Sequence, residues 1–263
     1  MLPFFALSIG AFVLFCVMAA MPPMERIFHA YDNKIKSERI SVIGGAVRSR
    51  YLENPAGGLI APADLALIPG YEYLDSYKAE IFQTGNAQNI NDSVWRFSRF
   101  AIWFPSTGMD IDPATYLDAA NNSCGTGTFA SATSWCGNSK SLWAKYETRI
   151  ENGSLLMGEK ARLVKVVSKF YRRYSADRKF TSLANGSYAT LASLTGYAGV
   201  ATGCTGVRTY DGIPFTCDEL FNAWGVPIVV NQVTAKRIAL VNRTGVINSN
   251  GQPVRLAEEA ALE

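Results

Sequence analysis

The chain begins with Leu2-Pro-Phe-Phe-Ala-Leu-Ser-Ile-Gly-Ala-Phe-Val-Leu-Phe-Cys-Val-Met-Ala-Ala-Met21, twenty residues without a charged side chain. An α-helix of this length spans about 30 Å, the thickness of the hydrocarbon core of a bilayer. The run therefore predicts a transmembrane helix over residues 1–23. A cleaved signal peptide is the alternative. It normally has a basic segment before a shorter apolar run, and here no Lys or Arg precedes the run.

Several small residues lie in this apolar run, and a proline lies at its end. Small side chains let helix backbones approach each other closely, so we expect the helix to pack against other helices in a membrane or a filament core. The predicted packing positions are Ser8, Gly10, Ala11, Ala19, Ala20 and Pro22.

The helix is predicted to continue beyond Pro22 with one apolar face. Apolar side chains recur every four or eight residues between charged ones, as an amphipathic helix requires. They are Ile27, Tyr31, Ile35, Ile43, Val47 and Tyr51. The sequence Glu53-Asn54-Pro55 predicts the end of the helix, because the residue before a proline disfavours helical geometry.

The composition favours a folded protein over a nucleic-acid-binding one. Of the 263 residues, 48% are hydrophobic and 18% are charged, and the formal net charge is +3. The basic residues are dispersed, without the dense basic stripe that nucleic-acid binding requires. We therefore expect no nucleic-acid partner.

The cysteines indicate the compartment. Cys16 lies in the apolar run, and the other four lie in loop-like sequence without the spacing of a zinc site. The simplest interpretation is two local disulfides, Cys124–Cys136 and Cys204–Cys217, although four cysteines allow three pairings. Disulfides indicate an oxidising compartment. The basic residues that follow the apolar run instead favour a cytoplasmic body by the positive-inside rule. We give the cysteines more weight.

Three sequence similarities, in the same order in both halves, suggest an internal repeat. Val47 to Tyr51 resembles Val167 to Tyr171, Ala63 to Tyr71 resembles Ala189 to Tyr197, and Arg99 to Gly108 resembles Arg237 to Gly245. We therefore predict an α+β protein in which a long N-terminal helix is followed by two small helix-plus-sheet modules, related by a divergent duplication.

The predicted boundaries follow from the sequence pattern. A second helix is predicted from Ser154 to about Tyr174, with a basic outer face that we interpret as solvated or as a site for an acidic partner or lipid headgroups. The predicted strands are 71–82, 93–104, 226–233 and 237–242. The predicted organisation is a first module at 24–113, a Gly/Ser/Asn-rich linker at 114–140, a second module at 141–247 and a polar tail at 248–263.

The sequence contains few residues in patterns typical of a catalytic site. His29 is the single histidine, and its position on the N-terminal helix does not suit a triad. We predict no cofactor and no metal site. Asp110 and Asp112 could ligate Ca²⁺, but a turn before Pro113 is the simpler interpretation.

Parts of the sequence resemble a known family. Tyr51-Leu-Glu-Asn-Pro-Ala-Gly-Gly58, Leu65-Ala-Leu-Ile-Pro-Gly-Tyr71 and Trp103-Phe-Pro105 are similar to the PilM-type thin-pilus accessory proteins of type IVb pilus systems, over residues 1–110. The overall order, a long N-terminal helix followed by a strand-rich head with a late cysteine pair, resembles type IV pilin-like proteins. Polymerising pilins usually carry Glu at the fifth mature position and follow a leader that ends in Gly. This sequence has Phe5 and shows no such leader before Met1, so we do not expect a major pilin.

The resemblance implies a structural function and not an enzyme. We expect an assembly component of a type IV pilus, as used in conjugation, or of a related secretion apparatus. Its partners would be the membrane, pilin or pilus-assembly proteins, and further copies of itself. The body would lie in the periplasm at the bacterial inner membrane, or on a cell-surface pilus. The alternatives are a major filament-forming pilin and, in another class, a membrane-tethered periplasmic hydrolase or wall-binding protein.

Overall fold

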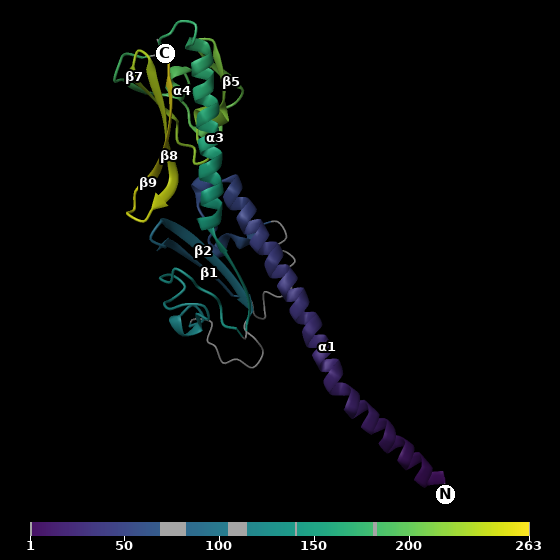
Figure 1. Ribbon diagram of the computed structural model, residues 1–263. Coiled ribbons are helices and arrows are strands. Elements are labelled where there is room, and N and C mark those ends of the chain that lie inside the picture. The colour runs from purple at the N-terminus through teal and green to yellow at the C-terminus, as the bar shows by residue number, and fades with distance from the viewer. Residues whose placement is uncertain (1, 69–82, 105–114, 140, 181–182, 263) are drawn as a thin grey trace.

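A computed structural model describes residues 2–68, 83–104, 115–139, 141–180 and 183–262. In the first half of the long N-terminal helix, the described side chains are Phe12, Met24 and those from Arg26 onwards. The helix projects from an elongated body, and the C-terminus lies at the opposite end of the molecule (Figure 1).

Helix α1 is continuous over Leu2–Glu53. The last third buries one stripe against the body, formed by Ile40, Ile43, Val47 and Tyr51. The pair Gly44-Gly45 does not interrupt the helix, because packing of this stripe outweighs a cost of about 1 kcal/mol per glycine. Past the helix end, the Asn54 side chain accepts a hydrogen bond from Gly57 N, and Pro55 starts the 3-10 turn η1 (Pro55–Gly57).

The prediction of a transmembrane helix over residues 1–23 is wrong. Within the described part of the chain, no helix is both long enough and apolar enough to cross a membrane. The described half of α1 carries charged side chains among its apolar ones, including Asp32, Lys34, Lys36 and Glu38, as an amphipathic helix does.

The first module is a three-stranded antiparallel meander of β1 (Gln83–Asn91), β2 (Trp95–Phe104) and β3 (Leu142–Glu147), with β2 in the centre. Alternate β2 side chains face opposite sides of the sheet. Phe100, Ile102 and Phe104 pack against α1 and the 3-10 turn η2 (Pro62–Leu67). Ala101 and Trp103 pack against the segment that leads to β3. Because both faces are covered, the second half of β2, from Phe100 to Phe104, is a continuous apolar run.

The second module repeats this plan with α3 (Thr148–Tyr174). Its meander consists of β7 (Val229–Thr234), β8 (Arg237–Asn248) and β9 (Pro253–Ala261), and the short β4 (Tyr188–Thr190) pairs with β7. One core lies between α3 and the strands. It includes Leu163, Val166, Phe170, Tyr174, Val230, Ile238 and Leu240.

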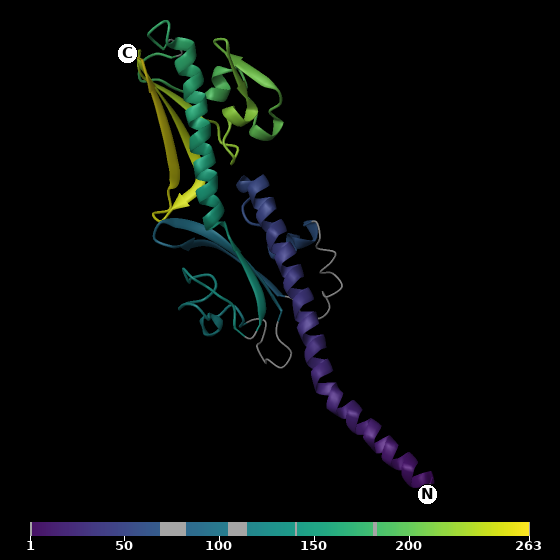
Figure 2. The same cartoon turned by 45° about the vertical axis from the view of Figure 1, so that its right-hand side comes forward.

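A small lobe packs on α3 beside the meander. It comprises α4 (Leu191–Leu194), the turn η4 (Ala201–Gly203), the hairpin β5–β6 (Val207–Tyr210 and Ile213–Thr216) and α5 (Cys217–Leu220). In Figure 2, the lobe and the yellow strands lie on opposite sides of α3.

The two meanders join at one corner. Two residue pairs connect β2 to β8, Trp95 with Asn248 and Arg96 with Ile247, so that all seven larger-sheet strands are linked. The cores on either side remain separate clusters. Two of the three sequence similarities fall on matching elements, since Val47 to Tyr51 and Val167 to Tyr171 lie near the ends of α1 and α3, and β2 and β8 are both central strands. The third pairs Leu65 of η2 with Leu191 of α4, and both side chains are buried. The duplication itself stays a prediction.

Several element boundaries differ from those predicted. Helix α3 begins at Thr148 and not at Ser154. The predicted polar tail contains strand β9, which pairs antiparallel with β8. Strand β3 lies within the predicted second module but pairs with β2. The predicted strand 71–82 lies outside the described residues. The predicted linker is folded where it is described, with Phe129 and Trp135 buried.

Candidate functional sites

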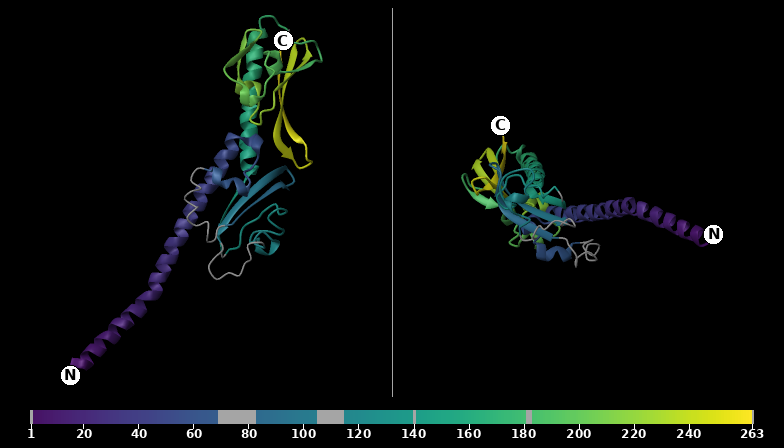
Figure 3. Two further views of the ribbon diagram at one scale, coloured as in Figure 1. Left: turned by 180° about the vertical axis from the view of Figure 1, so that it is seen from behind. Right: turned by 90° about the horizontal axis from the view of Figure 1, so that it is seen from below.

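The projecting half of α1 presents an unpartnered apolar face. Met24, Ile27, Phe28 and Tyr31 recur at helical spacing, and each side chain is more than half exposed. We call these four residues the projecting face. Figure 3 shows this part of α1 running away from the body in two further views. An exposed apolar stripe on a helix is suited to packing against another helix.

The predicted packing residues lie on the same helix. Ser8, Gly10, Ala11, Ala19, Ala20 and Pro22 all fall within α1, but their side chains lie outside the described part of the structure. His29, the single histidine, is exposed on α1 beside the projecting face. Asp110 and Asp112 lie outside the described residues.

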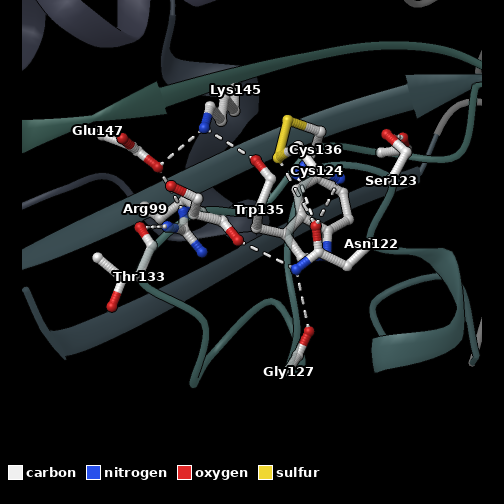
Figure 4. The surroundings of a disulfide bond; sticks show 12 residues. Arg99, Asn122, Ser123, Cys124, Gly127, Thr133, Trp135, Cys136, Lys145 and Glu147 are labelled. Carbon is white, nitrogen blue, oxygen red and sulfur yellow. Dashed lines mark hydrogen bonds and ion pairs between the residues drawn. A yellow bond between two sulfur atoms is a disulfide. The ribbon is translucent and has the colours of Figure 1, made fainter.

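The first disulfide, Cys124–Cys136, closes a loop on the outer face of the first meander (Figure 4). Asn122 organises this loop from within. Its Oδ1 accepts hydrogen bonds from the backbone N–H groups of both cysteines, and its Nδ2 donates to the carbonyl oxygens of Gly127 and Ser134.

Arg99 attaches the loop to the sheet. This β2 side chain is fully buried. Its guanidinium donates to Glu147 Oε1 at 2.7 Å and to the carbonyl oxygens of Phe129 at 2.8 Å and Thr133 at 3.0 Å. Burial lowers the pKa of Arg99, while the Glu147 carboxylate opposes that shift. Lys145 adds a second connection, since its Nζ lies 3.2 Å from Glu147 Oε1 and donates to Trp135 O.

Aromatic rings fill the space between the loop and the sheet. Trp103 and Tyr116 stack with centroids 4.4 Å apart, and Trp135 meets Phe129 edge-on at 4.9 Å. Tyr116 Oη hydrogen-bonds with Ser141 Oγ, and burial raises the pKa of the Tyr116 hydroxyl. The disulfide loop is therefore a packed part of the head and not a free linker.

The second disulfide, Cys204–Cys217, joins the lobe at the start of α5. The neighbouring Glu219 accepts a hydrogen bond from Thr216 N, which completes a capping box. Glu219 also binds Lys169 at 2.6 Å and Lys165 at 2.9 Å. Burial raises the pKa of Glu219, but the bonds from Lys169, Thr216 and Lys165 outweigh it and bring the pKa to about 2.

These bonds change the interpretation of the basic face of α3. Besides Lys165 and Lys169, Lys160 pairs with Glu258, Arg162 with Glu159, and Arg173 with Asp177 and Asp211. Most of this charge therefore holds α3 to its own lobe and sheet.

A small polar cavity of about 170 Å³ lies between the modules, lined by side chains that include Tyr51, Arg96, Ser98, Thr148 and Asn152. Tyr51 Oη donates to Asn152 Oδ1 at 2.5 Å. Burial raises the pKa of Tyr51 to about 12, so the hydroxyl stays protonated and acts as a donor. Together with the ion pair between Arg48 and Glu151, this bond fixes the end of α1 to the start of α3.

The described residues hold no group of three or more His, Cys, Asp and Glu side chains placed to bind a metal ion. Of the predicted site residues, the structure brings the four cysteines together in the two expected pairs. Sequence reasoning missed Arg99, Asn122 and Glu219. The sequence Thr216-Cys-Asp-Glu219 carries a capping-box signal for the last of these.

Comparison with known proteins gives no relative. No family model, no curated protein and no solved structure matches the chain.

Proposed function

We propose that this protein is a structural component of a type IV pilus or of a related secretion apparatus. It acts by packing α1 against helices of pilin or pilus-assembly proteins and by presenting the two modules as a head. The proposal rests first on the sequence resemblance at Tyr51–Gly58, Leu65–Tyr71 and Trp103–Pro105.

The observation that carries the proposal is the difference in burial between the two ends of α1. Ile40, Ile43, Val47 and Tyr51 are buried in the head, whereas the projecting face of the same helix is exposed. A helix with one end buried in a folded head and exposed apolar side chains at the other end is suited to packing in a bundle of similar helices. No chemical step is needed for this function.

The disulfides support a location outside the cytoplasm. Cys124–Cys136 and Cys204–Cys217 both close in the structure. Stable structural disulfides persist in oxidising compartments such as the periplasm or the cell surface. Non-reducing peptide mapping of protein from its native host should find both bonds. Free thiols at all four positions would contradict this location.

A crosslinking experiment tests the assembly function. A photo-crosslinking amino acid at Ile27, on the projecting face, should capture a pilin-like subunit in cells that assemble the apparatus. The same group at Val94 is the matched control, because Val94 is similarly exposed but lies on the head. Capture of an equal product from both positions, or of none from Ile27, would contradict the proposal.

Electron microscopy of the purified protein decides between two forms of the proposal. An accessory component should remain in small assemblies. Long filaments formed by this protein alone, with α1 in their core, would show that it is the major pilin and would contradict the accessory function that Phe5 favours.

A further inference from the structure

Helix α3 carries a second apolar face that nothing in the chain covers in the described structure. Ile150, Met157, Val164 and Tyr171 follow each other at intervals of seven residues, with exposures of 71%, 70%, 47% and 48%. Exposed small residues lie four positions after the first three of them. They are Ser154, Ala161 and Ser168. We call these seven residues the α3 seam.

The α3 seam differs from an ordinary solvated helix face. It contains no charged residue over about 32 Å of helix, at 1.5 Å per residue. Of the charged neighbours, Lys160 and Lys165 are bound to Glu258 and Glu219 of the same chain. The exposed Arg172 donates to Ser168 O within the helix. A run with intervals of four and three residues is the pattern by which one helix packs along another.

The seam is accessible in the folded chain. Helix α3 lies beside the yellow strands in Figure 1 and between those strands and the lobe in Figure 2. The four large seam side chains are 47–71% exposed. Ser168 Oγ donates to Val164 O within the helix, so covering the seam leaves this hydroxyl satisfied.

We infer that the α3 seam binds the α3 seam of a second copy of this chain, with the two helices antiparallel. In heptad terms, the large residues occupy the d positions and the small residues the a positions. Two parallel helices would place large against large and small against small. Two antiparallel helices place each a position level with a d position, so every layer pairs a large side chain with a small one.

This pairing gives close contact throughout the seam. Small residues allow the helix axes to approach toward the short end of the usual 8–10 Å range, and the large side chains fill the space beside them. The contact is isologous, as expected of a twofold dimer. It uses a surface separate from the projecting face of α1, so it does not depend on the proposed function.

Thiol crosslinking of the full chain tests both the contact and its direction. All variants carry Cys16→Ser, and the native disulfides stay oxidised. In the antiparallel dimer, Ala161 lies within about one turn of its copy. Ser154 lies roughly 15–26 Å along the axis from its own copy but close to Ser168 of the other chain.

A short bismaleimide should therefore link Ala161→Cys to itself. It should not link Ser154→Cys or Ser168→Cys alone, but it should link a mixture of these two variants. Equal self-linking at all three positions would show a parallel pair. The absence of any link would show that the seam does not dimerise. Either result overturns the inference.

A charge placed on the seam should separate the dimer. Met157→Glu should weaken dimerisation at least tenfold in analytical ultracentrifugation, because each copy would have to take a carboxylate out of water in an apolar contact. Val200→Glu is the matched control, since Val200 is 71% exposed but lies in the lobe. Both variants should keep the native circular dichroism spectrum. Equal effects of the two substitutions would contradict the inference.

Discussion

At the scale of single residues, Glu219 combines burial with several charged partners. Its folded pKa of about 2 lies below the ordinary value of 4.5, so it stabilises the fold above pH 4.5 and loses this contribution as the pH falls toward 2. Glu219→Gln should therefore cost about 2 kcal/mol at pH 7 and almost nothing near pH 2. Urea denaturation at several pH values measures this difference.

The control for Glu219 is a carboxylate in an exposed pair. Glu38 lies 4.0 Å from Lys34 on α1, and both side chains are about two-thirds exposed or more. Glu38→Gln should change stability by less than about 0.5 kcal/mol, because water screens such pairs. A pH-independent loss for Glu219→Gln would show that its carboxylate charge is not what stabilises the lobe.

Arg99 is a second buried charged residue that we expect to stabilise the fold, because it joins β2 to the loop closed by the first disulfide. Lysine at this position keeps a charge but cannot reach Glu147, Phe129 O and Thr133 O together. Arg99→Lys should destabilise the protein by about 2–4 kcal/mol and expose the amides around Phe129 to hydrogen exchange. Arg149→Lys, at a partly exposed ion pair with Asp92, should cost less than about 1 kcal/mol.

At the scale of elements, each disulfide supports a different module. Cys204 and Cys217 are 13 residues apart in sequence, and closing such a loop stabilises a protein by about 3 kcal/mol. Replacing both with Ser should speed hydrogen exchange in β5 and β6 and leave β1 to β3 unchanged. Replacing Cys124 and Cys136 should have the reverse pattern. Equal changes in both modules would show that the two disulfides are not local supports.

The elements also show how far the sequence could be interpreted. The last part of α1 and the strands β2, β7 and β8 follow from periodicity, because each buries a regular set of side chains. Strand β9 was missed because Ala257 to Ala261 has helical propensity, which pairing with β8 overrides. The hairpin β5–β6 did carry a signal. Asp211-Gly212 forms its turn, and both residues have positive φ.

Some of the candidate sites could be predicted from the sequence and others could not. The cysteine pairs could be predicted because a short separation in loop-like sequence leaves few alternatives. The α3 seam could not be predicted in the same way. Periodicity does indicate the core face of α3, which includes Leu163 and Val166. It does not indicate whether the other apolar residues of the helix, such as Met157 and Val164, are covered by the rest of the chain, and the structure shows that they are exposed.

At the scale of the whole molecule, the two modules should unfold as separate cooperative units. Each has its own core, one around Ile43 and Phe100 and the other around Leu163 and Phe170. The sheet connection between them is limited to two residue pairs of β2 and β8. A connection of this size transmits little cooperativity between domains.

Calorimetry of core variants tests this expectation. Ile43→Ala should lower one transition and Leu163→Ala the other, each by the equivalent of about 2–5 kcal/mol, because both side chains are almost fully buried. The unaffected module serves as the internal control for each variant. If either substitution lowered a single transition of the whole chain, the bonds from Arg48 and Tyr51 to the start of α3 would couple the cores, and the two modules would form one folding unit.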